Sequence, residues 1–218
     1  MNYFANSTSL VDDGAKIGDG TKVWHFSHIF SGAEIGENCS FGQNTMVADD
    51  VVVGNNVKVQ NNVAIYAGVV IEDDVFLGPS CVLTNVSNPR SQVVRKGVYE
   101  STTIKRGATV GANATIVCGV ELGRYCFIGA GTLVARSVPD YALILGVPGK
   151  QVGWMSRHGH RLDFTANEIA FCQESGYRYQ LVSKTSVKCI DLDEEDQLPS
   201  ELAIGDRQYV EFKEQRDA

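Results

Sequence analysis

The sequence predicts an all-β fold, a parallel β-solenoid of triangular cross-section. Three observations support this prediction. An aliphatic or aromatic anchor returns every six residues, a small or β-branched residue stands four positions after each anchor, and glycine often follows the anchor directly. A helix would drift around its axis under a period of six, and hairpins would need a reversing turn every few residues. Three hexads that close one coil, with coils stacked about 4.8 Å apart as parallel strands, satisfy the pattern.

The anchors form two unbroken series. They are Val11, Ile17, Val23, Ile29, Ile35, Phe41, Val47, Val53, Val59, Ile65, Ile71, Leu77 and Leu83, and then Ile104, Val110, Ile116, Leu122, Ile128 and Val134. These nineteen hexads predict about six coils and a prism about 30 Å long. Between the two series the spacing is twenty-one residues, so one corner must extrude a long loop over residues 84–103. Long loops in compact repeats are usually functional, and the basic content of this one favours an anionic ligand.

After Gly153 the periodicity ends, which divides the chain into a solenoid domain (1–153) and a C-terminal region (154–218). We expect residues 154–162 to form a short helix or turn that caps the prism. Alternation at 177–182 and 208–212 predicts a small antiparallel β appendage with a hairpin. The acidic run 191–196 is expected to be a solvated loop.

The composition and net charge argue against two classes of binding partner. The net charge of −7 and pI near 5.1 leave no broad basic surface, so nucleic acid and anionic membranes are not expected partners. The N-terminal residues lack the pattern of a secretory signal and no apolar run could span a bilayer, so we expect a cytoplasmic protein. The six cysteines are widely spaced and are expected to be reduced. Because His158, His160, Cys172 and Cys189 match no closed zinc pattern, we expect no metal.

The segments Ile35-Gly36-Glu37-Asn38-Cys39 and Ile128-Gly129-Ala130-Gly131-Thr132 resemble the hexapeptide repeat of left-handed β-helix acyltransferases. The resemblance, not the spacing, implies left-handed coils, because parallel crossovers are generally right-handed. It also implies acetyl-CoA as cosubstrate and a homotrimer with active sites between subunits.

Residues 83–90, with Arg95-Lys96 and 105–119, resemble bacterial sugar N-acetyltransferases, and residues 23–29 and 154–157 support the same subgroup. In that subgroup the substrate is the 3-amino group of UDP-2-acetamido-3-amino-2,3-dideoxy-D-glucuronate, acetylated for cell-surface polysaccharide such as the lipopolysaccharide O-antigen. The resemblance makes Asn85 the residue that orients the amine, since its amide oxygen can accept a hydrogen bond from it. Alternatively, Asn85 only shapes the mouth of the loop.

His28 and His25 are the alternative bases, or contacts to substrate, or part of a trimer seam. The departing CoA thiolate could take the proton instead. Substrate contacts are expected from Trp24, Asn88, Arg90, Arg95 and Lys96, because guanidinium groups pair with diphosphate or carboxylate. Each loop charge could also be merely solvated.

The resemblance places the CoA groove beside the last coils and the segment that follows them. The expected contacts are Gly111, Ala112, Asn113, Gly129, Ala130, Arg136, Val147, Pro148 and Lys150. The same segment could serve only as the C-terminal cap that repeat proteins require.

The sequence leaves three alternative classes of protein. The serious alternative is another hexapeptide-repeat enzyme that acetylates serine or a different amino sugar. A non-catalytic structural solenoid would not explain the basic loop. A carbonic-anhydrase-like enzyme would need three convergent histidines, and the coils contain none after His28.

Overall fold

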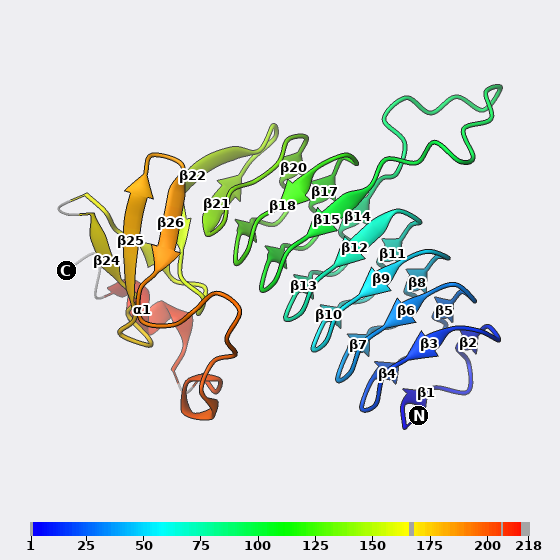
Figure 1. Ribbon diagram of the computed structural model, residues 1–218, viewed down its shortest axis with the longest axis horizontal. Coiled ribbons are helices and arrows are strands. Elements are labelled where there is room, and N and C mark those ends of the chain that lie inside the picture. Colours follow the sequence, from blue (N-terminus) through cyan, green and yellow to red (C-terminus); the bar gives the residue numbers. More distant parts are fainter. Residues whose placement is uncertain (1, 166–167, 206, 215–218) are drawn as a thin grey trace.

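The computed structural model describes residues 2–165, 168–205 and 207–214. Residues 4–145 wind into a prism of stacked parallel strands with three faces, as expected from the hexads (Figure 1). On each face a strand pairs with the strand one coil before it, for example Lys22 with Ser40 and Ser40 with Lys58. On one face this pairing is interrupted between Ala64–Ile65 and Val82–Leu83. The sequence therefore predicted the fold class correctly.

The strands divide among the faces in regular order. Face 1 contains β1 (Phe4–Ala5), β4 (Lys22–Val23), β7 (Ser40–Phe41), β10 (Lys58–Val59), β13 (Phe76–Leu77), β16 (Thr109–Val110), β19 (Phe127–Ile128) and β21 (Ala142–Leu145). Face 2 contains β2 (Leu10–Val11), β5 (His28–Ile29), β8 (Met46–Val47), β11 (Ala64–Ile65), β14 (Val82–Leu83), β17 (Thr115–Ile116) and β20 (Leu133–Val134). Face 3 contains β3 (Lys16–Ile17), β6 (Glu34–Ile35), β9 (Val52–Val53), β12 (Val69–Ile71), β15 (Thr102–Ile104) and β18 (Glu121–Leu122).

Three corners join these faces. Corner 1–2 consists of residues 6–9, 24–27, 42–45, 60–63, 78–81, 111–114 and 129–132. Corner 2–3 consists of residues 12–15, 30–33, 48–51, 66–68, 84–101 and 117–120. Corner 3–1 consists of residues 18–21, 36–39, 54–57, 72–75, 105–108 and 123–126.

The prism is longer than the two anchor series, because face 1 continues at both ends into β1 and β21. Ala5 stands six residues before Val11 and pairs with Val23, but its side chain is too small to mark a hexad. Ile144 pairs with Ile128, although it follows the last anchor by ten residues instead of six. Neither end could therefore be recognised from a strict period.

The anchors fill the interior of the prism. Val23, Ile29 and Phe41 are fully buried, and burial of such side chains is the main force that holds stacked coils together. Corner residues such as Asn38, with φ of 56°, adopt the left-handed conformation, which asparagine tolerates better than most residues. The hexads thus fix both the core and the corners.

Beyond the prism, β22 (Lys150–Met155) and β23 (Arg161–Leu162) add antiparallel to face 1. A separate sheet is formed by β24 (Ile169–Phe171), β25 (Arg178–Ser183) and β26 (Ser186–Cys189), followed by the 3₁₀ helix η1 (Ser200–Leu202) and the helix α1 (Tyr209–Glu214). The expected β appendage is therefore present, and β22 runs across residue 153, the expected boundary. All six cysteines are free and buried. Among the residues that the structure describes, no helix has the length and apolar character needed to cross a membrane.

Two expectations for the tail were wrong. Residues 154–162 form strand, turn and strand, because β22 pairs with β21 and Trp154 packs into the core. Residues 209–212 are helical, since the Glu211 carboxylate accepts a hydrogen bond from the Gln208 N–H at 2.9 Å, as at the start of a capped helix. Five alternating residues were too few to separate a strand from one helical turn.

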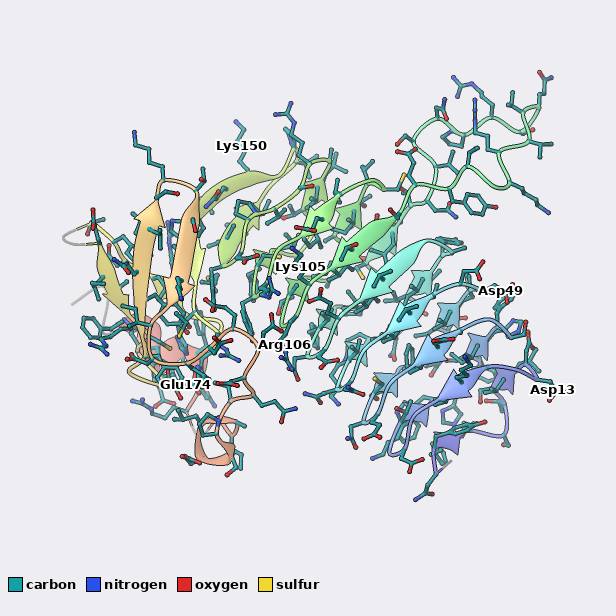
Figure 2. All side chains as sticks on the ribbon, in the orientation of Figure 1. Asp13, Asp49, Lys105, Arg106, Lys150 and Glu174 are labelled. Carbon is teal, nitrogen blue, oxygen red and sulfur yellow. The ribbon has the colours of Figure 1, made fainter. Side chains whose placement is uncertain are left out.

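The acidic run is not a solvated loop but docks against the prism. The Arg124 guanidinium contacts the Glu195 carboxylate at 2.5 Å, and the Tyr125 hydroxyl donates to the Glu194 carbonyl at 2.8 Å. Arg106, whose side chain is 10% exposed, lies between this run and the Asp73–Asp74 corner (Figure 2). The run is thus part of the contact between the prism and the C-terminal sheet.

Candidate functional site

The long loop leaves corner 2–3 between β14 and β15 and projects away from the prism (Figure 1). Its two ends are tied together where they leave the corner. The Glu100 N–H donates to the Asn85 carbonyl at 3.0 Å, and both Glu100 carboxylate oxygens accept bonds from Ser87, one from its N–H and one from its hydroxyl, each at 2.9 Å. These bonds lower the pKa of Glu100, the Ser87 N–H contributing most and the hydroxyl next. We call Asn85, Ser87 and Glu100 the loop clasp.

The next coil holds the start of the loop as well. The Cys118 N–H donates to the Thr84 hydroxyl at 3.0 Å, and the Cys118 thiol lies 3.5 Å from the Ser87 hydroxyl. Asn85 is half-buried and its main chain is fixed by the clasp. Within the described parts of the chain, its side-chain amide has no hydrogen-bond partner, so this amide is available to a ligand.

The predicted substrate residues of the loop lie close to one another. Arg90 and Arg95 line one hollow together with Pro89, and the Arg95 Nε donates to the Asn88 carbonyl at 3.0 Å. Lys96 is exposed in the outer part of the loop. Of the four predicted substrate residues on the loop, three therefore lie around one bend, namely Asn88, Arg90 and Arg95.

A second predicted group meets beside the last coil. Arg136, Pro148 and Lys150 line a pocket of about 500 Å³ between β20 and the turn that joins β21 to β22, and Figure 2 shows Lys150 projecting from this turn. The Gly149 N–H donates to the Leu133 carbonyl at 2.7 Å, which fixes the turn against face 2. Val147, at the same turn, is exposed. Two basic side chains at one pocket suit a phosphate group.

The five small residues predicted for the cofactor lie on corner 1–2. The packing of successive coils requires glycine at these positions, because a Cβ on Gly111 would lie 2.5 Å from the Ala130 nitrogen. A Cβ on Gly129 would collide with the Leu145 side chain. Asn113, with φ of 56°, is an exposed corner residue. Coil stacking thus explains these glycines without a ligand, and a role in cofactor binding stays a prediction.

Both predicted histidines make side-chain contacts with other residues. The Asn6 amide oxygen accepts from the Thr8 N–H at 3.0 Å, so the Asn6 amide nitrogen must donate to Nε2 of His25, 3.2 Å away. The His28 Nε2 lies 3.0 Å from the Asp12 carboxylate, and its ring stacks on Phe30. An imidazole held by a carboxylate is oriented as a base would be.

These histidines are not near Asn85 within one chain. β5, which carries His28, is separated from β14 by β8 and β11, so three coil steps of about 4.8 Å put roughly 14 Å between them. Trp24 and His25 lie on corner 1–2, whereas Asn85 lies on corner 2–3. Trp24, His25 and Asn85 therefore fall on the two corners that flank face 2, and His28 lies on face 2 itself.

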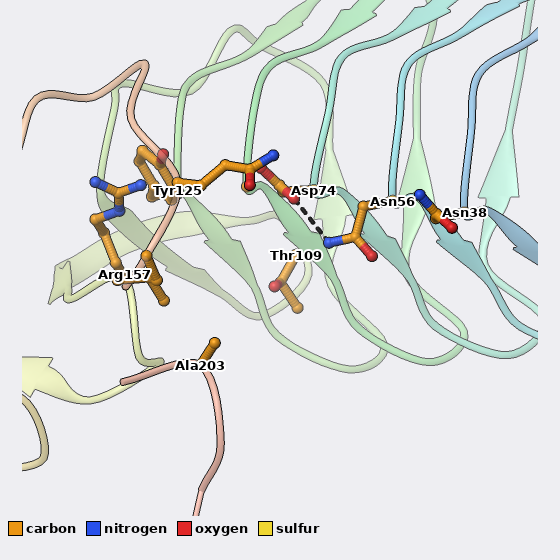
Figure 3. A pocket seen from close by; sticks show the side chains of 10 residues that line it. Asn38, Asn56, Asp74, Thr109, Tyr125, Arg157 and Ala203 are labelled. Carbon is orange, nitrogen blue, oxygen red and sulfur yellow. Dashed lines mark hydrogen bonds between the residues drawn. The ribbon is translucent and has the colours of Figure 1, made fainter. Parts of the chain in front are cut away.

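A further hollow of about 570 Å³ lies on corner 3–1, away from every predicted residue (Figure 3). Asn38, Asn56 and Asp74 project into it from successive coils, and the Asn56 amide donates to the Asp74 carboxylate at 2.8 Å. Arg157 closes one end by stacking over the Tyr125 ring. Among the described residues that line this hollow, Asp74 is the acidic one, and its carboxylate is already bonded to Asn56 and Arg106.

Three of the four residues considered as zinc ligands, His158, His160 and Cys172, have other side-chain contacts. His160 pairs with Glu174 at 2.6 Å, and His158 Nε2 bonds the Leu202 carbonyl at 2.9 Å. Burial raises the pKa of the Cys172 thiol, but the neighbouring His158, Ser156 and Ser175 outweigh this effect and lower it to about 6. In the part of the chain that the structure describes, no three His, Cys, Asp or Glu side chains converge as a metal site.

Reasoning from the sequence missed Glu100 and Ser87. Both belong to the same loop as Asn85, but they are thirteen residues apart and no period relates them. A signal did exist, because Glu100 is the only acidic residue between Thr84 and Ser101. A single acidic residue at the end of a basic loop could have indicated that this residue fixes the base of the loop.

Comparison with known protein families identifies the repeats of this chain. Residues 14–49, 50–85 and 101–136 match the family described as bacterial transferase hexapeptide (six repeats), and residues 32–67 match the hexapeptide repeat of succinyl-transferase. The gap between the second and third matches coincides with the long loop. The dTDP-3-amino-3,6-dideoxy-alpha-D-galactopyranose 3-N-acetyltransferase of Aneurinibacillus thermoaerophilus is 42% identical over 82 residues, which are 38% of this chain and 42% of that enzyme.

The serine acetyltransferase of Buchnera aphidicola subsp. Schizaphis graminum is 33% identical over 87 residues, which are 38% of this chain and 30% of that enzyme. The matches thus span less than half the length of these relatives. The crystal structure of a point mutant of AntD, an N-acyltransferase from Bacillus cereus in complex with dTDP and coenzyme A, is similar in fold, with a TM-score of 0.50, 14% identity and coverage of 72% of this chain and 85% of that one. The stacked coils and the family matches agree, and the chain belongs to the hexapeptide-repeat family of bacterial transferases, whose prism is the left-handed β-helix.

Proposed function

We propose that the chain is an acetyl-CoA-dependent N-acetyltransferase that acetylates the amino group of a nucleotide-linked sugar. As the acceptor we propose UDP-2-acetamido-3-amino-2,3-dideoxy-D-glucuronate, used in the cytoplasm for O-antigen synthesis. The observation that carries the proposal is the unbonded Asn85 amide, held by the loop clasp at the base of the loop that also carries Arg90 and Arg95. The similarity to a 3-N-acetyltransferase of a dTDP-amino sugar supports the same reaction class.

The chemistry needs a neutral amine, an oriented thioester and an exit for one proton. The Asn85 amide oxygen accepts a hydrogen bond from the amine and directs its lone pair at the thioester carbonyl. The new C–N bond forms, the C–S bond of acetyl-CoA breaks, and the amine proton passes to the CoA thiolate. An amine with a pKa near that of an α-amino group, about 8, is largely neutral already at slightly alkaline pH and needs no strong protein base.

Acetyl-CoA fits the pocket beside the last coil. Arg136 and Lys150 stand at this pocket and would hold a phosphate of the cosubstrate. Pro148 and the exposed Val147 would contact its apolar arm. The small residues of corner 1–2 would let that arm approach the main chain.

A homotrimer would bring together the predicted site residues that lie on different corners of one chain. The outward side chains of face 2 are Leu10, His28, Met46, Ala64, Val82, Thr115 and Leu133, which include no lysine, arginine or acidic residue. Three prisms packed with face 2 toward a three-fold axis would set corner 1–2 of one subunit against corner 2–3 of the next. Trp24, His25, Gly111 and Gly129 would then face Asn85 and Arg136 of a neighbour across one cleft.

A second candidate follows from the serine acetyltransferases, which are similar over 87 residues. The two candidates are separated by transfer of radiolabel from acetyl-CoA to a panel that holds UDP- and dTDP-linked amino sugars and serine. We expect label on the UDP-linked 3-amino sugar. Label on serine alone would replace the proposal, and no label on any acceptor would refute it.

Asn85→Ala tests the proposed role of the amide. We expect kcat to fall about 100-fold, because the amine loses its orientation, while the oligomeric state and melting temperature stay unchanged. Gln92→Ala, on the exposed part of the same loop, is the matched control and should keep wild-type activity. An unchanged kcat in Asn85→Ala would reject this assignment.

A further inference from the structure

The hollow on corner 3–1 has a floor made by corner residues of the prism. These residues stand at one position of four successive coils, each with a positive φ and with its N–H bonded to a carbonyl of the coil before: Asn38, Asn56, Asp74 and Gly107. A Cβ on Gly107 would collide with the Tyr125 ring, so glycine is required for this ring to lie against the floor. The repeat itself therefore fixes the shape of this side of the hollow.

The second wall of the hollow comes from the tail, through Gln197, Leu198 and Ala203 (Figure 3). Prism and tail are joined beside it, since the Tyr125 hydroxyl donates to the Glu194 carbonyl at 2.8 Å. The volume of about 570 Å³ lies within the range of about 300–1,000 Å³ that small-ligand sites have. A ligand of that size would contact both parts of the molecule at once.

The charged groups of the hollow are bonded within the protein. The Asp74 carboxylate accepts from the Asn56 amide at 2.8 Å and from Arg106 at 3.2 Å. The Arg157 guanidinium donates to two main-chain carbonyls of the acidic run 191–196. Because this run brings several carboxylates close to Arg157, an anion is disfavoured there. The hollow therefore favours a ligand without negative charge.

Uncharged polar groups of the hollow are left for a ligand. Among the residues that the structure describes, the side chains of Asn38, Thr109 and Gln197 have no hydrogen-bond partner, and the Asn56 amide oxygen is also unbonded. Amides and hydroxyls both donate and accept, and Asn38 and Asn56 are one coil step of about 4.8 Å apart. Sugar hydroxyls also donate and accept, so a saccharide can pair with such a row while its carbon atoms contact Leu198.

From these groups we infer that the hollow binds an uncharged saccharide at a site separate from that of acetyl transfer. Corner 3–1 lies opposite face 2, so the hollow stays open when other subunits cover face 2. The inference does not rest on the proposed function, because it uses none of the residues assigned to that reaction. A bound saccharide bridges prism and tail, so its binding free energy adds to the stability of the docked tail.

The probes are D-glucose, D-galactose and D-mannose, each titrated into the full chain by calorimetry beside its uronate, which has the same ring and a carboxylate. We expect at least one neutral sugar to bind, and to bind more tightly than its uronate. Thr109→Val keeps the shape of the side chain and removes the hydroxyl, so binding should weaken about fivefold. Thr103→Val is the matched control, because Thr103 is also half-buried and faces outward, but on face 3.

Two further variants locate the bound sugar. Asn38→Gly removes an amide of the floor and keeps the positive φ, which glycine adopts freely, so affinity should again fall about fivefold. Asn85→Ala should bind the sugar as the wild type does, since Asn85 lies on corner 2–3. The inference is overturned if no neutral sugar binds at millimolar concentration, if Thr109→Val and Thr103→Val bind equally well, or if Asn85→Ala loses binding.

Discussion

Asn85 depends on a carboxylate that is not expected to touch the substrate. Glu100 fixes the Asn85 carbonyl with its own N–H and holds Ser87 with both carboxylate oxygens. Because the loop is otherwise exposed, these three bonds determine where it leaves the prism. We therefore regard Glu100 as a positioning residue for the proposed reaction.

The loop clasp should open in acid. The folded-state pKa of Glu100 is lowered from its ordinary value of 4.5 by the bonds from Ser87. A lowered pKa means that the clasp is fully formed above the ordinary value and is lost as the pH falls through the lower, folded-state value. We expect the Ser87 amide resonance to titrate in that acid range in NMR spectra and to stop titrating in Glu100→Gln. A Ser87 resonance that does not move in acid would show that the clasp is absent in solution.

At the scale of elements, Arg106 is one of the residues that join the prism to the acidic run, beside Arg124 and Tyr125. Arg106 bonds the Asp74 carboxylate at 3.2 Å, approaches Asp73 at 3.3 Å and also contacts Glu195. Its side chain is 10% exposed, so removal of the guanidinium leaves carboxylates partly buried without their partner. The acidic run should then lose its place against corner 3–1.

Arg106→Ala should lower the free energy of unfolding by about 2 kcal/mol. Lys105→Ala is the matched control, since Lys105 pairs with Glu121 at 2.8 Å, and Glu121 is 51% exposed. That more solvated pair should contribute less than about 1 kcal/mol. Urea unfolding of both variants measures the difference. Equal losses would mean that the docked acidic run adds nothing to stability.

The elements differ in how far the sequence could predict them. Anchors such as Val23 and Ile128 point into the prism at every coil, so their period revealed the fold, the faces and the long loop directly. The docking of Glu195 arises from contacts with distant residues, and no local pattern encodes it. The helical turn at Tyr209 has a local bond between Gln208 and Glu211, but its few residues alternate as a strand would. Asn85 was found through its resemblance to a family, whereas Glu100 became visible only when the loop closed on Ser87.

At the scale of the whole molecule, the proposed cleft depends on how three prisms meet. Face 2 carries no lysine, arginine or acidic residue at its outward positions, and both of its bounding corners hold predicted site residues. A solitary prism would leave Asn85 and Trp24 on separate corners. The account therefore requires the homotrimer for activity.

Val82→Asp should weaken the trimer at least about tenfold, because a carboxylate would be buried in an apolar contact. Val82 is 47% exposed on face 2, and its matched control is Val52→Asp, on face 3, where Val52 is 44% exposed. Analytical ultracentrifugation across a dilution series should show dissociation only in the first variant. Equal behaviour of the two would place the subunit contact elsewhere.

Complementation between two variants, each expected to impair one side of the proposed cleft, tests the central claim most directly. One variant is Asn85→Ala, and the other carries alanine at Trp24, His25 and His28. In trimers assembled from equal amounts of both, a cleft is intact when one subunit supplies Asn85 and its neighbour supplies the other three residues, which happens in about a quarter of clefts by random assortment. Acetyl transfer to the UDP-amino sugar restored to about that fraction of wild type is the predicted result. Activity no greater than that of the two variants alone would contradict a site shared between subunits.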